Sequence, residues 1–179
     1  MTPSPLLADL APAAGDGATA ATLVVLSVTA GSQDFVIDAG VIREIRGWCP
    51  PVPLPGAPAY VQGMSDLRGE VMLLISLASR MGLGGAPSVQ PVTVVLEGRE
   101  GLVGLVVDAV SDLHSVSAGQ LKAVPDTGLP TPGELLRGVV EIEGRLLGLV
   151  AVEQIIPTAR AELSAHGQSE APLMSVGFG

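Results

Sequence analysis

One histidine is the natural starting point for any hydrolytic chemistry in this sequence. His114 has two aspartates nearby, Asp108 and Asp112, and a Ser-His-Asp hydrolase requires a histidine between a nucleophile and a carboxylate. Successive residues of a strand point to opposite faces, however, and the sequence contains no nucleophile-elbow motif. We therefore interpret His114 as a surface or edge residue rather than as a catalytic base.

Metal and phosphate chemistry have little support in the sequence. A single cysteine, Cys49, and two distant histidines do not supply the four ligands of a zinc site. The glycine-rich run 82–85 lacks the lysine of a phosphate-binding loop. Two acidic residues, Glu141 and Glu143, fit a solvated hairpin tip better than a pair of catalytic carboxylates. The sequence therefore predicts no catalytic residue, no metal and no cofactor, and an inert Cys49 that packs beside Trp48.

The charge balance excludes two classes of partner. The net charge is −9, and Lys122 is the single lysine. Binding to nucleic acid or to an anionic membrane surface requires clustered lysine and arginine, which the sequence lacks. It also contains no apolar run of the roughly 20 residues needed to span a bilayer. A lone cysteine forms no internal disulfide, which fits a reducing cytoplasm.

The elements that position these side chains are predicted to be mostly β-strands. Hydrophobic residues make up 47% of the chain and aromatic residues only 2%, so valine, leucine, isoleucine and alanine must form the core. Besides the hairpin discussed next, strands are expected at 22–28, 34–37, 92–96, 102–107, 110–116, 139–142 and 145–150. A helix is expected at 151–165, interrupted at Pro157.

A hairpin between Tyr60 and Leu83 organises the chain. Two apolar strands flank a turn at 66–69, where Gly69 provides the backbone freedom that the turn requires. The charges of this segment gather at that tip. An arginine on a rigid hairpin tip, as Arg68 is, contacts partners more often than it enters a core.

The two halves of the sequence resemble each other. Residues 24–26 and 36–39 recur at an offset of 70, and the hairpin sequence 63–77 recurs from Gly138 at an offset of 75. Two similar small β-barrels would explain the recurrence, although short apolar hairpins also resemble one another by chance. Barrels of this size have marginal cores alone, so we expect them to pack face to face, with a groove that suits a partner helix.

The two hairpin tips differ in charge, because Glu143 stands where the first copy has Arg68. If the copies are related, the fold does not dictate the charge at this position, and Arg68 becomes a candidate for recognition. Glu44, in the segment V-I-R-E-I-R, is the second candidate. A bridge that holds the hairpin in place and a contact with a partner remain equally open for this pair.

The segment G-M-S-D-L-R-G-E-V-M-L-L-I-S-L resembles the central motif of the CheW-like adaptor family, G-x-x-N-L-R-G-x-x-x-P-x-x-D-L. The resemblance continues in V-I-R-E-I-R, G-L-V-V-D-A-V-S-D-L and G-V-V-E-I-E-G-R-L-L-G-L-V-A-V-E-Q-I-I, and covers residues 21–157. It departs from the pattern at Asp66, Leu73, Ser76 and Ala151, which leaves open which partner is recognised. The first alternative is a CheW-like regulator of a pilus or other non-flagellar pathway. A more remote alternative is a small ligand-binding or hydrolytic β-barrel.

The resemblance implies two intertwined five-stranded SH3-type β-barrels with short helices and a C-terminal helix. It implies a non-enzymatic cytoplasmic adaptor at receptor arrays, near the inner membrane or in a cytoplasmic cluster. Its partners would be the regulatory domain of a CheA-type histidine kinase and the cytoplasmic helical hairpin of a chemoreceptor.

The resemblance also implies site residues and boundaries. It places Glu44, Ile45 and Arg68 in or beside the partner contacts, and Val110 and Leu113 along the groove between the barrels. The expected organisation is a tail at 1–20, a CheW-like domain at 21–158 with related hairpin repeats at 22–82 and 92–156, and the end of the helix with a tail at 159–179.

Overall fold

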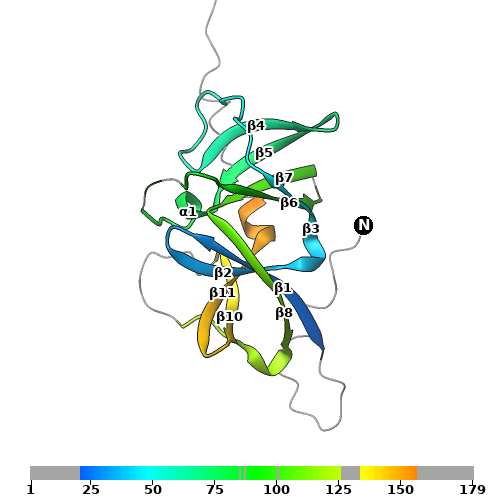
Figure 1. Cartoon of the computed structure of the whole chain (residues 1–179), viewed down its shortest axis with the longest axis vertical. Helices are drawn as coiled ribbons and strands as arrows, with labels where there is room; N and C mark the ends of the chain where they lie inside the picture. The colour runs from blue at the N-terminus through cyan, green and yellow to red at the C-terminus, as the bar shows by residue number, and fades with distance from the viewer. Residues whose placement is uncertain (1–20, 85, 87, 100, 126–133, 157–179) are drawn as a thin grey trace, which may run out of the picture.

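The computed structural model describes residues 21–156 except 85, 87, 100 and 126–133, and in this part the chain folds into two β-sheets (Figure 1). The predicted tails and the helix beyond 156 lie outside the described residues. The six-stranded sheet has the order β8-β1-β2-β11-β10-β9 and the five-stranded sheet the order β3-β6-β7-β5-β4. The prediction of a mostly β chain is confirmed, while closure of each sheet into an SH3-type barrel stays a prediction.

The strands and helices have the following bounds. The six-stranded sheet contains β1 (Thr22–Ala30), β2 (Gln33–Asp38), β8 (Ala109–Ser117), β9 (Leu121–Lys122), β10 (Leu136–Ile142) and β11 (Arg145–Val150). The five-stranded sheet contains β3 (Ile42–Gly47), β4 (Val61–Leu67), β5 (Glu70–Ser76), β6 (Val92–Gly98) and β7 (Gly101–Val107). The helical elements are η2 (Ala39–Val41), α1 (Leu77–Arg80), η3 (Ala118–Gln120) and residues 152–156.

Each sheet takes strands from both halves of the chain. The β1–β2 hairpin pairs with β8 and β11, and the β6–β7 hairpin pairs with β3 and β5. The contacts β2–β11 and β5–β7 are parallel, and the other pairs are antiparallel. The two halves are therefore intertwined, and neither half can complete a sheet without the other.

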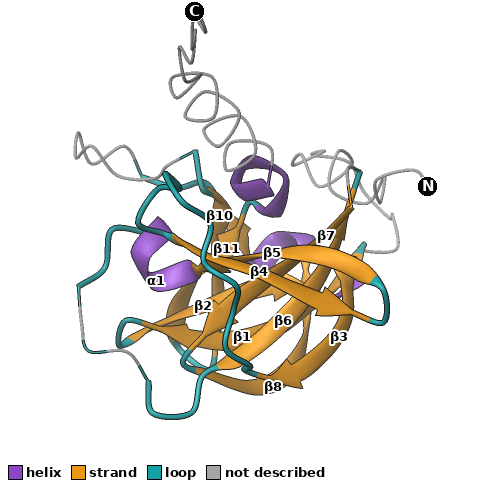
Figure 2. Ribbon diagram, turned by 90° about the horizontal axis from the view of Figure 1, so that it is seen from above, coloured by secondary structure: helices purple, strands orange, loops and turns teal. Residues whose placement is uncertain are grey.

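The main core lies between the two sheets. It joins Leu26 and Ile37 of one sheet to Ile75 and Leu105 of the other, and Ile155 of the C-terminal helical turn packs with them. Figure 1 shows this turn, in orange, between the two sheets, and Figure 2 shows it from above. Because each sheet also has a smaller interior of its own, the central strands are buried on both faces. This burial explains the continuous apolar runs in the sequence.

The two sheets repeat one pattern of pairing. Ignoring the short β9, the order β8-β1-β2-β11-β10 corresponds strand for strand to β3-β6-β7-β5-β4. The later hairpins correspond at the predicted offset of 75, since Gly63 faces Leu74 and Gly138 faces Leu149. In both hairpins the register shifts just before this glycine, so the bulge is repeated as well.

The predicted offset of 70 for the first hairpins is wrong by two residues. The last pair before the turn is Ala30–Gln33 in β1–β2 and Gly98–Gly101 in β6–β7, which gives an offset of 68. Side chains alternate between the two faces of a strand with a period of two. An alignment of the two hairpins that is wrong by two residues therefore still matches core-facing residues with core-facing residues. Only the position of the turn reveals the true register.

Two departures from the family motif keep the local fold. Ser76 caps α1, because its Oγ accepts a hydrogen bond from the backbone N–H of Ser79 at 3.3 Å. Leu73 is buried and joins the main core. No helix within the described residues has the length and apolar character required to cross a membrane.

Candidate functional site

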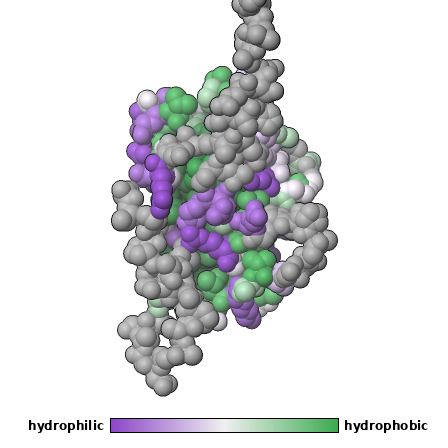
Figure 3. All heavy atoms as spheres, turned by 180° about the vertical axis from the view of Figure 1, so that it is seen from behind, coloured by the Kyte–Doolittle hydropathy of each residue, from purple (hydrophilic) through white to green (hydrophobic). Residues whose placement is uncertain are grey.

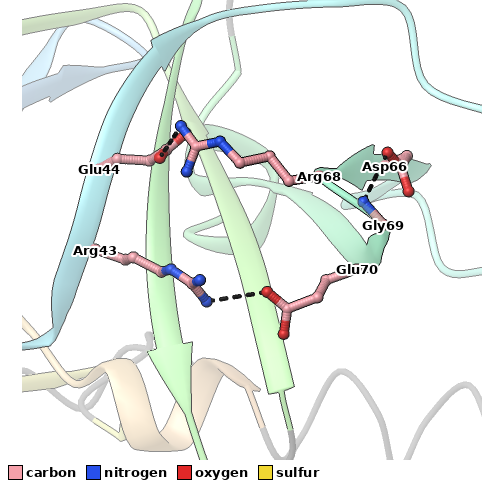
Figure 4. A network of polar contacts seen from close by, with 6 residues as sticks. All are labelled: Arg43, Glu44, Asp66, Arg68, Gly69 and Glu70. Carbon is pink, nitrogen blue, oxygen red and sulfur yellow. Dashed lines mark hydrogen bonds and ion pairs between the residues drawn. The ribbon is translucent and has the colours of Figure 1, made fainter.

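The tip of the β4–β5 hairpin closes on two residues in the left-handed region. Leu67 faces Glu70, and between them Arg68 has φ 53° and Gly69 φ 89°. Positive φ at both central residues is typical of the tight hairpin turns whose twist matches that of the strands. Asp66 fixes the turn, because its Oδ1 accepts a hydrogen bond from the N–H of Gly69 at 3.2 Å (Figure 4). An aspartate thus provides the side-chain acceptor where the family has an asparagine.

Arg68 reaches from this tip to β3, where its Nη2 lies 3.0 Å from Oε2 of Glu44 (Figure 4). The structure therefore brings together two of the residues singled out in the sequence. The side chain of Arg68 is 74% exposed and that of Glu44 23% exposed. Glu44 thus acts as the more sheltered anchor, and much of the Arg68 side chain remains open to a partner.

A second ion pair runs beside the first with opposite polarity. Nη1 of Arg43 lies 3.1 Å from Oε2 of Glu70 (Figure 4). β3 and the tip therefore each provide one cation and one anion to the two ion pairs. β3 is an outer strand of its sheet, and the two ion pairs join it to the turn residue Arg68 and to Glu70 at the start of β5. Exposed ion pairs stabilise folding by only about 0–1 kcal/mol each. The pairs therefore set the orientation of Arg68 more than they stabilise the fold.

Ile45 follows Glu44 on β3 but lies on the other face of the strand. It is opposite Val94, whose side chain enters the main core, yet Ile45 itself is 47% exposed. Ile45 is therefore an exposed apolar residue beside the ion pairs rather than a member of their network.

Val110 and Leu113 lie on β8, at the edge of the other sheet from Arg68. Val110 is half-buried against the main core, whereas Leu113 is 63% exposed and faces Leu26. The five predicted residues thus divide into an Arg68–Glu44 pair, an adjoining Ile45, and two residues on a separate outer strand.

A cavity of about 290 Å³ opens at the junction of the two sheets, and sequence reasoning predicted no site there. Trp48, 39% exposed, lines it together with residues of the β1–β2 turn and of α1 and with residues 83, 84, 86, 88, 89 and 91. The indole N–H of Trp48 donates a hydrogen bond to Oε1 of Gln62 at 3.2 Å. One signal was present in the sequence, because this is the single tryptophan of an aromatic-poor chain and it precedes a proline-rich loop.

A smaller cleft of about 180 Å³ lies between β8 and the tip of the β10–β11 hairpin. We call it the β8 cleft, and its polar lining is Ser27, Asp34, Ser111, Asp112, His114, Glu143 and Arg145. Asp112 and His114 thus share one face of β8, because they are two residues apart. The sequence-based expectation of opposite faces is wrong for this pair.

Ser27 brings a hydroxyl to the same histidine, since its Oγ lies 3.4 Å from Nε2 of His114. Ser27 is otherwise engaged by the backbone of Asp112, to whose oxygen it donates and from whose N–H it accepts. A triad would need a carboxylate on the other ring nitrogen, and none bonds to it within the described residues. The arrangement is one of local hydrogen bonding, and the described part also contains no group of three His, Cys, Asp or Glu that could hold a metal.

The pKa of Asp34, which lines this cleft, is lowered by two partners. A hydrogen bond from the Thr29 hydroxyl, 2.8 Å long, lowers the pKa of Asp34 below its ordinary 3.8, and the ion pair with Arg145 lowers it further. Both partners stabilise the charged form. Asp34 is therefore ionised at neutral pH, and Arg145 is held by it.

The face opposite to that in Figure 1 carries hydrophilic residues across its middle, with hydrophobic residues in separate small groups (Figure 3). A broad apolar surface is therefore not visible among the coloured residues of this face. The candidates for recognition remain the tip of β4–β5, the outer strands and the two hollows.

Comparison with known proteins agrees with these features. A family model described as the CheW-like domain matches residues 24–160. The chemotaxis protein CheW of Rhizobium meliloti (strain 1021) is 40% identical over 133 residues, which cover 74% of this chain and 86% of the relative. The chemotaxis protein CheW of Klebsiella aerogenes is 30% identical over 139 residues, covering 77% of this chain and 84% of the relative.

A solved structure supports the same fold. The crystal structure of the scaffolding protein TtCheW from Thermoanaerobacter tengcongensis matches with a TM-score of 0.68, over 79% of this chain and 90% of that chain. The identity in this comparison is 15%, so the match concerns the fold alone.

Proposed function

This chain belongs to the CheW-like family, and we propose that it acts as a non-enzymatic adaptor in a chemosensory pathway. The adaptor couples chemoreceptors to a CheA-type histidine kinase through protein–protein contacts. Receptor signals reach the kinase because a change at one contact alters the free energy of the other, which is the coupling that an adaptor requires.

The partner contacts can be proposed more finely. On the kinase side we infer the CheW-like regulatory domain, and on the receptor side the cytoplasmic tip of the helical hairpin. The assembly would form in the cytoplasm, in receptor arrays or in a cytoplasmic cluster. We place Glu44, Ile45 and Arg68 at one contact and Val110 and Leu113 at another, on the outer strands of the two sheets.

We also propose that residues 21–158 form one CheW-like domain from two related repeats, 22–82 and 92–156. The equal strand order of the two sheets and the repeated bulge before Gly63 and Gly138 support a duplication.

The observation that carries the site proposal is the backbone conformation of Arg68 together with the exposure of its side chain. A positive φ is unfavourable for an arginine, so local conformation does not explain this residue at the turn. Its ion pair with Glu44 is too exposed to contribute much stability. A mostly exposed guanidinium, oriented by a sheltered carboxylate, is well suited to bind a carboxylate of a partner protein.

Titration calorimetry with the kinase regulatory domain and, separately, with a receptor hairpin fragment tests this proposal. We expect Arg68→Glu to weaken at least one of the two interactions by about tenfold or more, as for the loss of a charged hydrogen bond. Arg99→Glu is the matched control, because Arg99 is also exposed at a hairpin tip but lies on β6–β7. Equal affinities of wild type and Arg68→Glu for both partners would remove Arg68 from the site.

A further inference from the structure

We propose that one face of the β4–β5 hairpin binds a lysine side chain of a partner protein. Val52, Asp66 and Val71 make up this surface, and we call it the Val52–Val71 face. The inference comes from comparing this hairpin with the β10–β11 hairpin of the same chain. It concerns a surface other than the Arg68–Glu44 pair, and it does not depend on the adaptor function.

The three residues of the Val52–Val71 face lie side by side on neighbouring stretches of chain. Val52 forms a β-bridge with Met64, and the two residues exchange both backbone hydrogen bonds. Asp66 lies two residues beyond Met64 on β4 and therefore on the same face, and Val71 of β5 is directly opposite Asp66. Both valines are mostly exposed, and Asp66 is exposed as well. A carboxylate thus lies between two exposed apolar side chains.

The β10–β11 hairpin repeats this arrangement with one exchange. Three positions correspond at the offset of 75, namely Met64, Asp66 and Val71 with Val139, Glu141 and Leu146. Lys122 of β9 pairs with Val139, so it has the position that Val52 has in the first hairpin. Nζ of Lys122 lies 3.0 Å from Oε2 of Glu141. In this hairpin the neighbouring strand therefore provides a cation to the carboxylate.

Asp66 lacks the cation that its counterpart has. Within the described residues it forms no ion pair, and valine at position 52 has no charge to offer. Figure 4 shows Arg68 extending to Glu44, whereas Asp66 is directed toward Gly69. An asparagine would accept the hydrogen bond from Gly69 equally well, so the turn alone does not require a negative charge at this position. A lysine from a partner would complete the arrangement seen in the other hairpin.

A lysine fits this face better than an arginine. A guanidinium binds best to both oxygens of a carboxylate, but Oδ1 of Asp66 already accepts a hydrogen bond from Gly69. An ammonium is a compact charge that can use the remaining oxygen, and its four-carbon stem can lie along apolar side chains. Val52 and Val71 provide apolar surface on both sides of Asp66. The partner is therefore expected to present a lysine from an otherwise apolar segment.

A titration of the full chain with the peptide acetyl-Val-Lys-Val-amide, followed by backbone amide chemical shifts at low salt, tests the proposal. We expect saturable shifts at Val52, Asp66 and Val71. Asp66→Asn should weaken binding at this face by about three- to fivefold, as for the loss of an exposed ion pair, while it keeps the acceptor for Gly69. The peptide with norleucine in place of lysine should bind wild type no better than the lysine peptide binds Asp66→Asn. Absence of saturation at these residues, equal binding by Asp66→Asn, or equal binding of the norleucine peptide would overturn the proposal.

Two exchanges between the hairpins provide a second test. Val52→Lys should place a lysine on Asp66, as Lys122 is placed on Glu141, and should abolish the peptide-induced shifts at Asp66. Lys122→Val should free Glu141 and create a second set of saturable shifts beside Leu146. Both exchanged side chains are exposed, so the fold should persist, and urea unfolding verifies this. If Val52→Lys leaves peptide binding unchanged, or if Lys122→Val creates no second site, the proposal fails.

Discussion

Ile45 on β3 and Leu113 on β8 occupy the same position in the two sheets, 68 residues apart. Ile45 faces Val94 and Leu113 faces Leu26, and these two partners are themselves separated by 68 residues and are buried in the main core. Each exposed side chain thus lies next to an apolar side chain that is buried in the core between the two sheets. A partner with two related surfaces could be met by both, because the intertwined topology presents the same edge twice.

Replacement of either exposed residue by serine should leave folding unchanged. Leu113 is 63% exposed and Ile45 47% exposed, so either substitution removes only part of a side chain's buried area, and we expect the free energy of unfolding to fall by no more than about 1.5 kcal/mol. The buried neighbour gives the contrast, because Leu26→Ala should lower it by about 2–5 kcal/mol. Urea unfolding measures both. A large loss of stability in Ile45→Ser or Leu113→Ser would show that these side chains serve the fold, and would weaken their assignment to partner contacts.

Arg68→Asn separates conformation from recognition. Asparagine adopts the left-handed region more readily than arginine, and left-handed backbone costs an ordinary residue about 1–2 kcal/mol. Loss of the exposed ion pair with Glu44 offsets at most about 1 kcal/mol of this gain. We therefore expect the melting temperature to stay equal or rise, while affinity for the kinase domain or the receptor fragment falls. A clear drop in melting temperature would show that Arg68 stabilises the hairpin.

The register of the repeated hairpins shows how far a single sequence can lead. The pattern of apolar residues predicted the strands and the duplication, because a strand that is buried on both faces has a continuous run of valine and leucine in its sequence. It placed the first hairpins at an offset of 70 instead of 68, because a slip of two residues preserves which letters face inward. The position of the turn decides the register. The turn residues of the two hairpins, Gly31–Ser32 and 99–100, have no residue type in common, so sequence comparison did not align them.

The candidate site was predictable where charge and turn coincide. Arg68 stood out as an arginine on a hairpin tip whose counterpart in the second copy is Glu143, and Glu44 as the carboxylate of the segment V-I-R-E-I-R; the structure joins them. The β8 cleft was not predictable, since Ser27 lies in an apolar run with nothing local to mark it. Long-range pairing, which the sequence does not state, creates this site.

The acid sensitivity of folding should depend on Asp34. Its pKa in the folded protein lies below 3.8, so Asp34 stabilises the fold fully above that pH and ceases to do so as the pH falls through the folded pKa. Thr29→Val removes the hydrogen bond that contributes most to this shift. We expect Thr29→Val to be less stable than wild type at neutral pH and the difference to shrink in acid. Urea unfolding across this pH range measures it, with Thr29→Ser as the control that keeps a hydroxyl. A difference that is independent of pH would contradict the assignment.

Gly104 of β7 should tolerate no side chain, for reasons of space rather than of backbone conformation. It has no left-handed φ, but a Cβ built on it would lie 2.4 Å from Cδ2 of Leu74 and 2.8 Å from Cγ2 of Thr93. Both neighbours are buried and cannot swing into solvent. We expect Gly104→Ala to lower the free energy of unfolding by about 1–3 kcal/mol, with an unchanged denaturant slope.

Gly47 provides the matched control for that substitution, because it also lies in a strand but has no atom within 4 Å of its added Cβ. Gly47→Ala should therefore cost little. A further test of the steric cause combines Gly104→Ala with Leu74→Val, which shortens the side chain that the new methyl group meets. If crowding is the cause, the double variant loses less stability than the sum of the two single losses, because one substitution relieves what the other creates. Strict additivity would mean that Gly104 is needed for some reason other than close approach to Leu74.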